Sequence, residues 1–291
     1  MTVRNLEYSR QDTLGIGVEL IRQVKRRRTL VAFLLVVALP LIVVAAVKFG
    51  PSSGGNGGGN QGGGFGDGGF DLVGLATSGA WNFALTMLLF SSGFLLVIIA
   101  AMFLGDTVAS EASWSTLRYL LVAPVPRRKL LRTKAIVGLI LTAITLLTLV
   151  VVSWAIGAVA FGTGPLASPF GGAFTQGESL QRLSIITTYI AITLLFPAAL
   201  AFLMSVLTDV PLGAVGTAVV VVIVLNILDA IDALGTLRRF LPGDYGTAWV
   251  DALNPIIMWN QMAIGLAYNL MAFAILVGIA VLRFDRKDIT S

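Results

Sequence analysis

Six long apolar runs constrain this chain more than any other feature of its sequence. They occupy approximately residues 29–47, 81–104, 135–161, 183–207, 212–234 and 258–282. A helix of about 20 apolar residues, rising about 1.5 Å per residue, crosses roughly 30 Å of hydrocarbon, so each run is long enough to span a membrane. Of the 291 residues, 56% are hydrophobic and 12% are charged, which is more apolar surface than a soluble core can bury. The sequence therefore predicts an all-α polytopic membrane protein, a single domain over 1–291 with six transmembrane helices.

The composition excludes several classes of chemistry. The chain has neither cysteine nor histidine, so disulfides, thiol nucleophiles, histidine bases and zinc or haem sites built on those ligands are excluded. No lysine follows glycine in the phosphate-binding pattern of ATPases. Composition alone leaves Ser-Lys or paired-carboxylate catalysis open, but no span carries a carboxylate pair near its centre and no nucleophile elbow is present. We therefore expect no ATPase site, no enzymatic activity, and no metal or cofactor bound by this chain.

A glycine-rich segment follows the first apolar run. Residues 54–69 hold eleven glycines in sixteen positions, and within them Gly64, Gly66 and Gly69 match G-x-G-x-x-G. No strand precedes that match, so it does not indicate a nucleotide-binding loop. The composition favours a flexible connector, which we place in an outer loop over 50–78.

The basic residues are distributed unevenly between the two sides predicted by six spans. Sixteen of the twenty lie in residues 1–28, in 105–134 and in the C-terminal tail, and the other four are Lys48, Arg182, Arg238 and Arg239. Because basic loops stay in the cytoplasm, both termini and the 105–134 loop are predicted to be cytoplasmic in a multi-pass cell-membrane protein. This explains the pI of about 9.8 without a nucleic-acid partner.

Two further segments are predicted to lie at the membrane surface. In residues 1–28, Ile16, Leu20 and Val24 share one helical stripe, which favours an interfacial helix in the lipid headgroup layer. A disordered basic tail is the alternative for this segment. Residues 235–255, before the last span, are too many for a turn and too polar for a span. We predict an outer, partly re-entrant element with short helical pieces there.

The 105–134 segment carries six basic residues between two apolar runs. Ser113 suits a helix N-cap, and Trp114, Leu117 and Leu121 then recur on one face. Pro124 ends that short helix, and Pro126 suits the start of the next one. An amphipathic helix tethered between two spans is a surface that a soluble partner can push against, and a plain segment packed on lipid is the alternative.

Polar residues inside the spans are candidates for a translocation path. Thr145 and Thr188 favour close helix packing, with a substrate path as the alternative. Asn226 and Asp229, near the outer end of the fifth span, form either a solvated pair or an outer-vestibule site. Asp106, at the inner end of the second span, is expected to reach water. Pro197 is predicted to kink the fourth span.

The central loop resembles that of type-2 ATP-binding-cassette (ABC) transporter permeases. The residues that carry the resemblance are Glu111, Thr116-Leu117, Leu120-Leu121, Pro124, Arg127 and Lys134, and the tail from Arg283 to Ile289 resembles the family's ending. The resemblance implies the transmembrane subunit of an ATP-driven exporter, which pairs with a second permease copy, identical or not. It also implies two separate ATPase subunits that hold ATP and Mg²⁺.

The same resemblance implies which residues couple the two kinds of subunit. The helix over 113–122 would sit in a groove of the ATPase. Its expected contacts are Trp114, Leu117 and Leu121 as buried anchors and Glu111 and Arg118 as polar contacts, with Arg127 following in the family's Pro-x-x-Arg pattern.

Two other function classes remain alternatives. One is a polytopic scaffold or assembly protein without a transport role. The other is an ion-coupled secondary transporter, which typically shows related halves and broken midplane helices. No internal repeat is visible in this sequence. Spans without midplane charge favour an amphipathic drug, lipid or peptide as cargo over a free ion.

Overall fold

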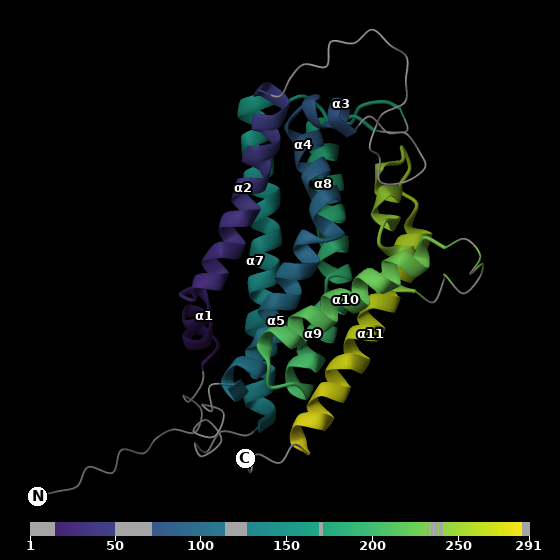
Figure 1. The fold of residues 1–291 in the computed structure, drawn as a ribbon. Helices are drawn as coiled ribbons and strands as arrows, with labels where there is room; N and C mark the ends of the chain where they lie inside the picture. The colour runs from purple at the N-terminus through teal and green to yellow at the C-terminus, as the bar shows by residue number, and fades with distance from the viewer. Residues whose placement is uncertain are drawn as a thin grey trace, which may run out of the picture.

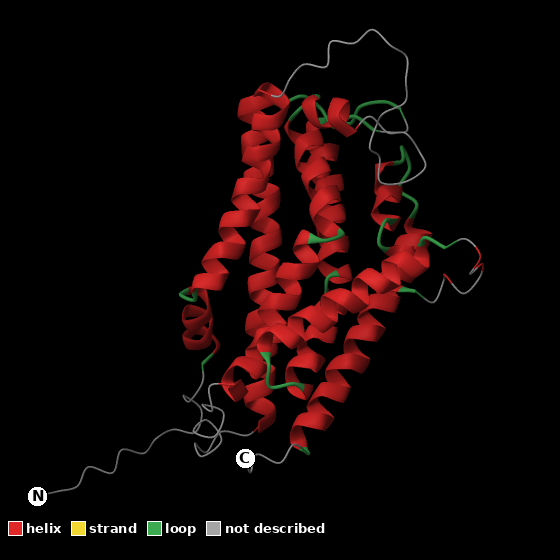
Figure 2. Cartoon of the chain, in the orientation of Figure 1, coloured by secondary structure: helices red, strands yellow, loops and turns green. Residues whose placement is uncertain are grey.

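A computed structural model describes the following parts of the chain: residues 15–49, 72–113, 127–168, 171–231, 233, 235, 238 and 241–286. Every named element in these parts is a helix, and the one β feature among them is an isolated bridge between Ala167 and Ala173. Figure 2 shows most of the long helices running along one axis, with the helix over 211–229 crossing them obliquely. The all-α prediction is confirmed.

The helices follow in chain order, labelled as in Figure 1. They are α1 (Ile16–Val24), α2 (Arg27–Phe49), α3 (Leu72–Thr77), α4 (Ala80–Ser92), α5 (Leu95–Ser113), α7 (Arg127–Phe161), α8 (Gln176–Thr193), α9 (Leu195–Leu207), α10 (Pro211–Asp229), η2 (Pro242–Tyr245), η3 (Ala248–Leu253) and α11 (Trp259–Asp285). Among the described residues, five spans are long and apolar enough to cross a membrane: α2, α7, α8 with α9, α10 and α11. The pair α4 and α5 makes a sixth if the two helices count as one span, although they are bent by 56°. The described part of the chain therefore has the architecture of a helical membrane protein, with five to six helices that could span a membrane.

The helix boundaries differ from the prediction in three places. The second apolar run, predicted as one span, is broken at Gly93, because glycine after two serines weakens a helix interior. Residues 72–77, which we assigned to the glycine-rich loop, form α3. Ser113 is the last residue of α5 rather than the N-cap of a new helix, and its hydroxyl donates to the carbonyl oxygen of Ser110 (3.0 Å). The remainder of the predicted glycine-rich loop, 50–71, lies outside the described residues.

The core lies where α5 packs against α9 and α4 packs against α7. Phe83, Leu104 and Phe202 are among its fully buried side chains. The α8–α9 span is interrupted at Leu194, one turn before Pro197, because the proline ring clashes with the carbonyl of the preceding turn. In α2, α10 and α11 only 17% of each apolar window is buried, against 56% in α8–α9, so these three helices form the periphery.

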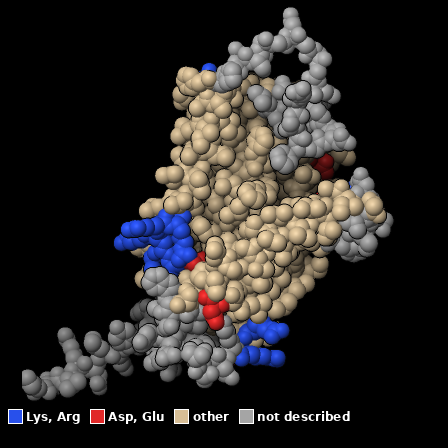
Figure 3. Space-filling model, viewed as in Figure 1, with Lys and Arg blue, Asp and Glu red and all other residues tan. Residues whose placement is uncertain are grey.

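Charge is concentrated at one end of the molecule. Figure 3 shows most of the visible Lys, Arg, Asp and Glu side chains gathered there. Most of the visible surface along the helices is formed by uncharged residues. The first turn of α7 meets the last turn of α11 at this end, where Arg128 Nε lies 2.8 Å from Asp285 Oδ2. The C-terminal end of α5 and helix α1 lie there too, and the apolar helices separate this charged end from the opposite one (Figure 1).

The opposite end is held together by a buried arginine. The guanidinium of Arg182 in α8 donates to the carbonyl oxygens of Ala252, Asn254 (2.6 Å) and Pro255 (3.0 Å) and lies 3.9 Å from the centre of the Phe174 ring. The sequence analysis counted Arg182 only as one of the four basic residues on the outer side. In the structure it fixes the segment before α11, where η2 and η3 supply the short helical pieces that we predicted.

A close helix approach near this segment gives a stability prediction. The hydroxyl of Tyr189 donates to the carbonyl oxygen of Tyr245 (2.6 Å), and a Cβ added at Gly265 would lie 2.3 Å from that hydroxyl. Gly265→Ala should therefore lower the free energy of unfolding by about 1–3 kcal/mol. At Gly278 in the same helix a Cβ meets nothing within 4 Å, so Gly278→Ala should be neutral or stabilise by up to about 1 kcal/mol. Thermal unfolding of the two purified variants tests this, and equal shifts would contradict the close approach.

Candidate functional site

Helix α1 turns its polar face toward the protein. Glu19 and Gln23 are buried, whereas Ile16, Val18 and Ile21 are exposed. A helix on a soluble protein shows the reverse arrangement. An apolar face directed away from the protein suits a helix at the membrane surface, as the stripe in residues 16–24 predicts.

The buried face of α1 joins a charged cluster formed by Glu19, Arg22, Glu111 and Lys134. The carboxylate Oε1 of Glu111 in α5 lies 2.6 Å from Arg22 Nη2 in α1 and 2.6 Å from Lys134 Nζ in α7. Glu19 lies 2.9 Å from the same Arg22 nitrogen and 3.5 Å from Lys134 Nζ. Three helices are thereby connected through four side chains.

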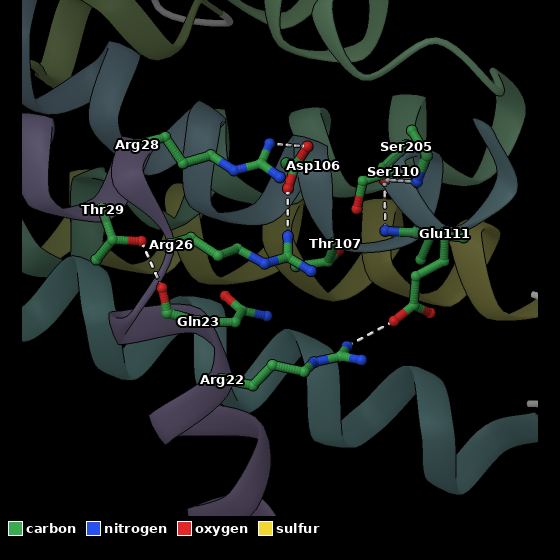
Figure 4. A network of polar contacts seen from close by, with 12 residues as sticks. Arg22, Gln23, Arg26, Arg28, Thr29, Asp106, Thr107, Ser110, Glu111 and Ser205 are labelled. Atoms are coloured by element: carbon green, nitrogen blue, oxygen red, sulfur yellow. Dashed lines mark hydrogen bonds and ion pairs between the residues drawn. The ribbon is translucent and has the colours of Figure 1, made fainter. Parts of the chain in front are cut away.

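A second group of ion pairs holds the link between α1 and α2. Asp106 in α5 accepts from Arg26 Nη1 (2.8 Å) and also pairs with Arg28 (Figure 4). The hydroxyl of Thr29 donates to the carbonyl oxygen of Gln23 (2.7 Å), which closes the turn between the helices. Asp106 is 4% exposed, so our expectation that it reaches water is wrong. Two arginines, one from the link between α1 and α2 and one from the first turn of α2, pair with this carboxylate instead.

Burial makes these charges depend on one another. Lys134 is 1% exposed and Glu111 is 4% exposed, and an ion in such a place is tolerated only when it is paired. Burial raises the pKa of Glu19, but the charge of Lys134 and hydrogen bonds from Gln23 and Arg22 outweigh it, so this pKa lies below its usual value. Since the folded-state pKa is below the unfolded one, Glu19 stabilises the fold at neutral pH. That contribution is lost only as the pH falls through the lowered pKa.

The cluster is also connected to α9. The backbone N–H groups of Val108 and Ala109 in α5 both donate to the hydroxyl of Ser205 (3.0 Å each). Figure 4 shows Ser205 of α9 beside Ser110 of α5. Ser110 lies on the same stretch of α5 as Asp106 and Glu111. This part of α5 is thus bonded to α1, α7 and α9.

Glu111 is engaged within its own chain, and its predicted contact with an ATPase stays a prediction. We predicted a polar contact at the edge of an ATPase groove, but Glu111 is buried among cations of its own chain. Arg127 is the first residue of α7. Trp114, Leu117, Arg118 and Leu121 lie outside the described residues.

The candidate path residues fall into two pairs. The hydroxyls of Thr145 and Thr188 each donate to a carbonyl oxygen of their own helix, four residues earlier (2.8 Å in both cases). This is the bonding expected of a threonine that serves helix packing. Asn226 and Asp229 both lie against Gly243 of η2, and Asp229 is 3.6 Å from Arg238 Nε. Asn226 and Asp229 therefore belong to the joint between α10 and η2.

The cluster links helices through ion pairs. In the described part of the chain, no group of three or more Asp or Glu side chains is placed to hold a metal ion. The ion pair between Glu111 and Lys134 instead joins the two helices that flank residues 114–126. Sequence reasoning missed Glu19, Arg22 and Ser205. For Glu19 the available signal was an acidic residue within an otherwise basic segment, and no comparable signal marked Arg22 or Ser205.

Comparison with known proteins places these features in a family. The protein named "Uncharacterized protein YhcI" from Bacillus subtilis (strain 168) is 30% identical over 120 residues, which are 39% of this chain and 37% of the relative. The match thus spans little more than a third of that relative's length. A family described as "Protein of unknown function (DUF2705)" matches residues 68–290, which include α3 through α11 and both Glu111 and Lys134. The chain belongs to this DUF2705 family.

Proposed function

We propose that this protein is the transmembrane subunit of an ATP-driven ABC exporter. It pairs with a second permease copy and with two ATPase subunits that bind ATP and Mg²⁺. The chain lies in the cell membrane with both termini and the 105–134 loop in the cytoplasm. The observation that carries the proposal is the buried ion pair between Glu111 and Lys134 (2.6 Å), which joins both flanks of segment 114–126. Both residues also belong to the loop pattern that resembles type-2 permeases.

The geometry supports a route from that segment into the membrane. A partner that moves segment 114–126 displaces the C-terminal end of α5 and the N-terminal end of α7 together. Buried paired charges resist separation, because an unpaired charge in such a place costs about 3–5 kcal/mol. The displacement therefore reaches α1 through Arg22 and α9 through Ser205. In the proposed cycle, closure of the ATPase pair on ATP tilts these helices and opens a path outward.

The cargo proposed for this path is amphipathic or apolar. A cavity of about 270 Å³ between α7 and the α8–α9 break supports this choice. Thr142, Leu146 and Leu194 are among its lining residues, and no charged side chain is. The candidates for the path remain Thr145, Thr188, Asn226 and Asp229.

The direct test is purification of the tagged protein from its native membrane. We expect an ABC ATPase to copurify, with ATP hydrolysis retained in the complex. A non-transporting scaffold would purify without ATPase activity. A secondary transporter would move cargo in vesicles in response to an ion gradient without ATP, and either result would overturn the proposal.

The orientation gives a separate prediction. Because the chain has no cysteine, single cysteines report their own exposure to an impermeant thiol reagent. Gln176→Cys, at the exposed start of α8, should be labelled on intact cells. Arg128→Cys, where the native side chain is 75% exposed, should be labelled only after permeabilisation. Ser110 is unsuitable as the inner position because it is buried. The reverse labelling pattern would place the 105–134 loop outside and contradict the coupling route.

A further inference from the structure

A groove opens between α9 and α11 at the charged end of the molecule, where the C-terminal ends of both helices lie (Figure 1). Its volume is about 530 Å³. Its lining residues are Val206, Leu207, Ile279, Leu282, Arg283 and Arg286. None of these residues belongs to the charged cluster, so the groove is a separate feature of this end of the molecule.

Two cations, Arg283 and Arg286, line the groove. Arg283 and Arg286 are three residues apart, so they share one face at the end of α11. Among the described residues, neither has an ion-pair partner within 4.0 Å. Asp285, between them, is directed to α7 instead, where its Oδ2 lies 2.8 Å from Arg128 Nε. The groove is therefore cationic.

The walls next to these cations are apolar and exposed. Leu207, Ile279 and Leu282 are exposed by 50%, 41% and 59%. Ile279 lies one turn further into the apolar part of α11 than Arg283, so the apolar wall extends from the cations into the spanning region. A ligand that matches this surface carries a negative charge at one end and an alkyl chain at the other.

We propose that the groove binds an anionic phospholipid. The phosphate contacts Arg283 and Arg286, because a guanidinium matches phosphate in charge and in hydrogen-bond geometry. The acyl chain lies along Leu282, Ile279 and Leu207. Basic pockets between helices at a membrane surface are typical sites for such headgroups. This site does not depend on the exporter proposal.

The test is a lipid titration of the purified full-length protein in phosphatidylcholine nanodiscs containing increasing fractions of phosphatidylglycerol, with bound lipid counted by native mass spectrometry. Arg283→Gln combined with Arg286→Gln should weaken phosphatidylglycerol binding about 30-fold, since each basic residue near an anionic lipid contributes about 1 kcal/mol, which is about a fivefold effect. The matched control is Lys25→Gln combined with Arg132→Gln. These are two exposed basic residues of the same end outside the groove, and their loss should change binding by less than about threefold.

Each other outcome decides against the proposal. Equal losses in the two double variants would mean general attraction between a basic surface and an acidic membrane. Unchanged binding in the Arg283 and Arg286 variant would mean that the groove holds no lipid phosphate. Glycerol 3-phosphate, which lacks acyl chains, should not displace phosphatidylglycerol, and full displacement would indicate a free-phosphate site. If the arginine variant keeps its lipid but loses a copurifying protein, the groove is a protein contact.

Discussion

Glu111→Gln should lower the free energy of unfolding by about 3–5 kcal/mol, the largest stability effect that we expect from one substitution in this protein. The change leaves Lys134, which is 1% exposed, with Glu19 as its remaining carboxylate in the cluster at 3.5 Å. Arg22 loses its 2.6 Å partner in α5 at the same time. The measurement is equilibrium unfolding of the purified protein in mixed micelles, followed by the signal of its tryptophans.

A double-mutant cycle separates the ion pair from a general packing defect. Lys134→Met removes the buried cation, so Glu111→Gln combined with Lys134→Met should cost less than the sum of the single changes. We expect a coupling energy of about 1–3 kcal/mol. The matched control is Asp285→Asn, which breaks an ion pair to a side chain that is 75% exposed and should cost less than about 1 kcal/mol. If Glu111→Gln costs no more than this control, the cluster does not hold α1, α5 and α7 together.

The membrane architecture could be predicted because hydrocarbon imposes simple demands on a sequence. A spanning helix needs length and an apolar composition, and both are visible without knowledge of neighbouring helices. The amphipathic character of α1 was predictable from its helical period, but only part of the predicted stripe faces outward: Ile16 and Val24 are exposed, whereas Leu20 packs against the core. The break at Gly93 was missed because Leu95–Leu104 continues the apolar composition, which hides the weak Ser91-Ser92-Gly93 sequence.

The charged cluster could not be predicted because its partners are far apart in sequence. Arg22 and Glu111 are 89 residues apart, and Arg26 and Asp106 are 80 apart. A carboxylate at the end of an apolar run appears water-exposed until the fold places α1 beside it. The resemblance singled out Glu111 and Lys134 as residues of one loop pattern, but it did not predict that they bond to each other.

The contacts of Arg182, at the opposite end of the molecule, could not be predicted for the same reason. Counting basic residues assigns a charge to a side of the membrane and says nothing of its burial. The three carbonyl oxygens that Arg182 contacts lie 70–73 residues later in the chain. Charge counts therefore predict topology, whereas the pairing of each charge requires the three-dimensional fold.

Trp114→Ala combined with Leu117→Ala should abolish or strongly weaken association with the ATPase while the apolar helices still insert into the membrane. This prediction rests on the proposed function and concerns residues outside the described parts of the chain. Truncating a buried aromatic anchor at an interface commonly costs on the order of 2 kcal/mol or more, which is about a 30-fold loss of affinity. Copurified ATPase and ATP-dependent transport are measured for each variant, with membrane insertion determined separately.

The matched control is Ile16→Ala combined with Val18→Ala, which also removes two large apolar side chains from a surface helix at the charged end. Both residues are exposed on α1, so their loss should leave ATPase binding unchanged. Under the proposed function, the apolar side chains of Trp114 and Leu117 would contact the ATPase, whereas Ile16 and Val18 would face lipid. If the Trp114 and Leu117 variant retains full ATPase binding and transport, the 113–122 segment does not carry the coupling. The buried pair of Glu111 and Lys134 would then stabilise the fold without relaying force, because nothing would push on the segment that it joins.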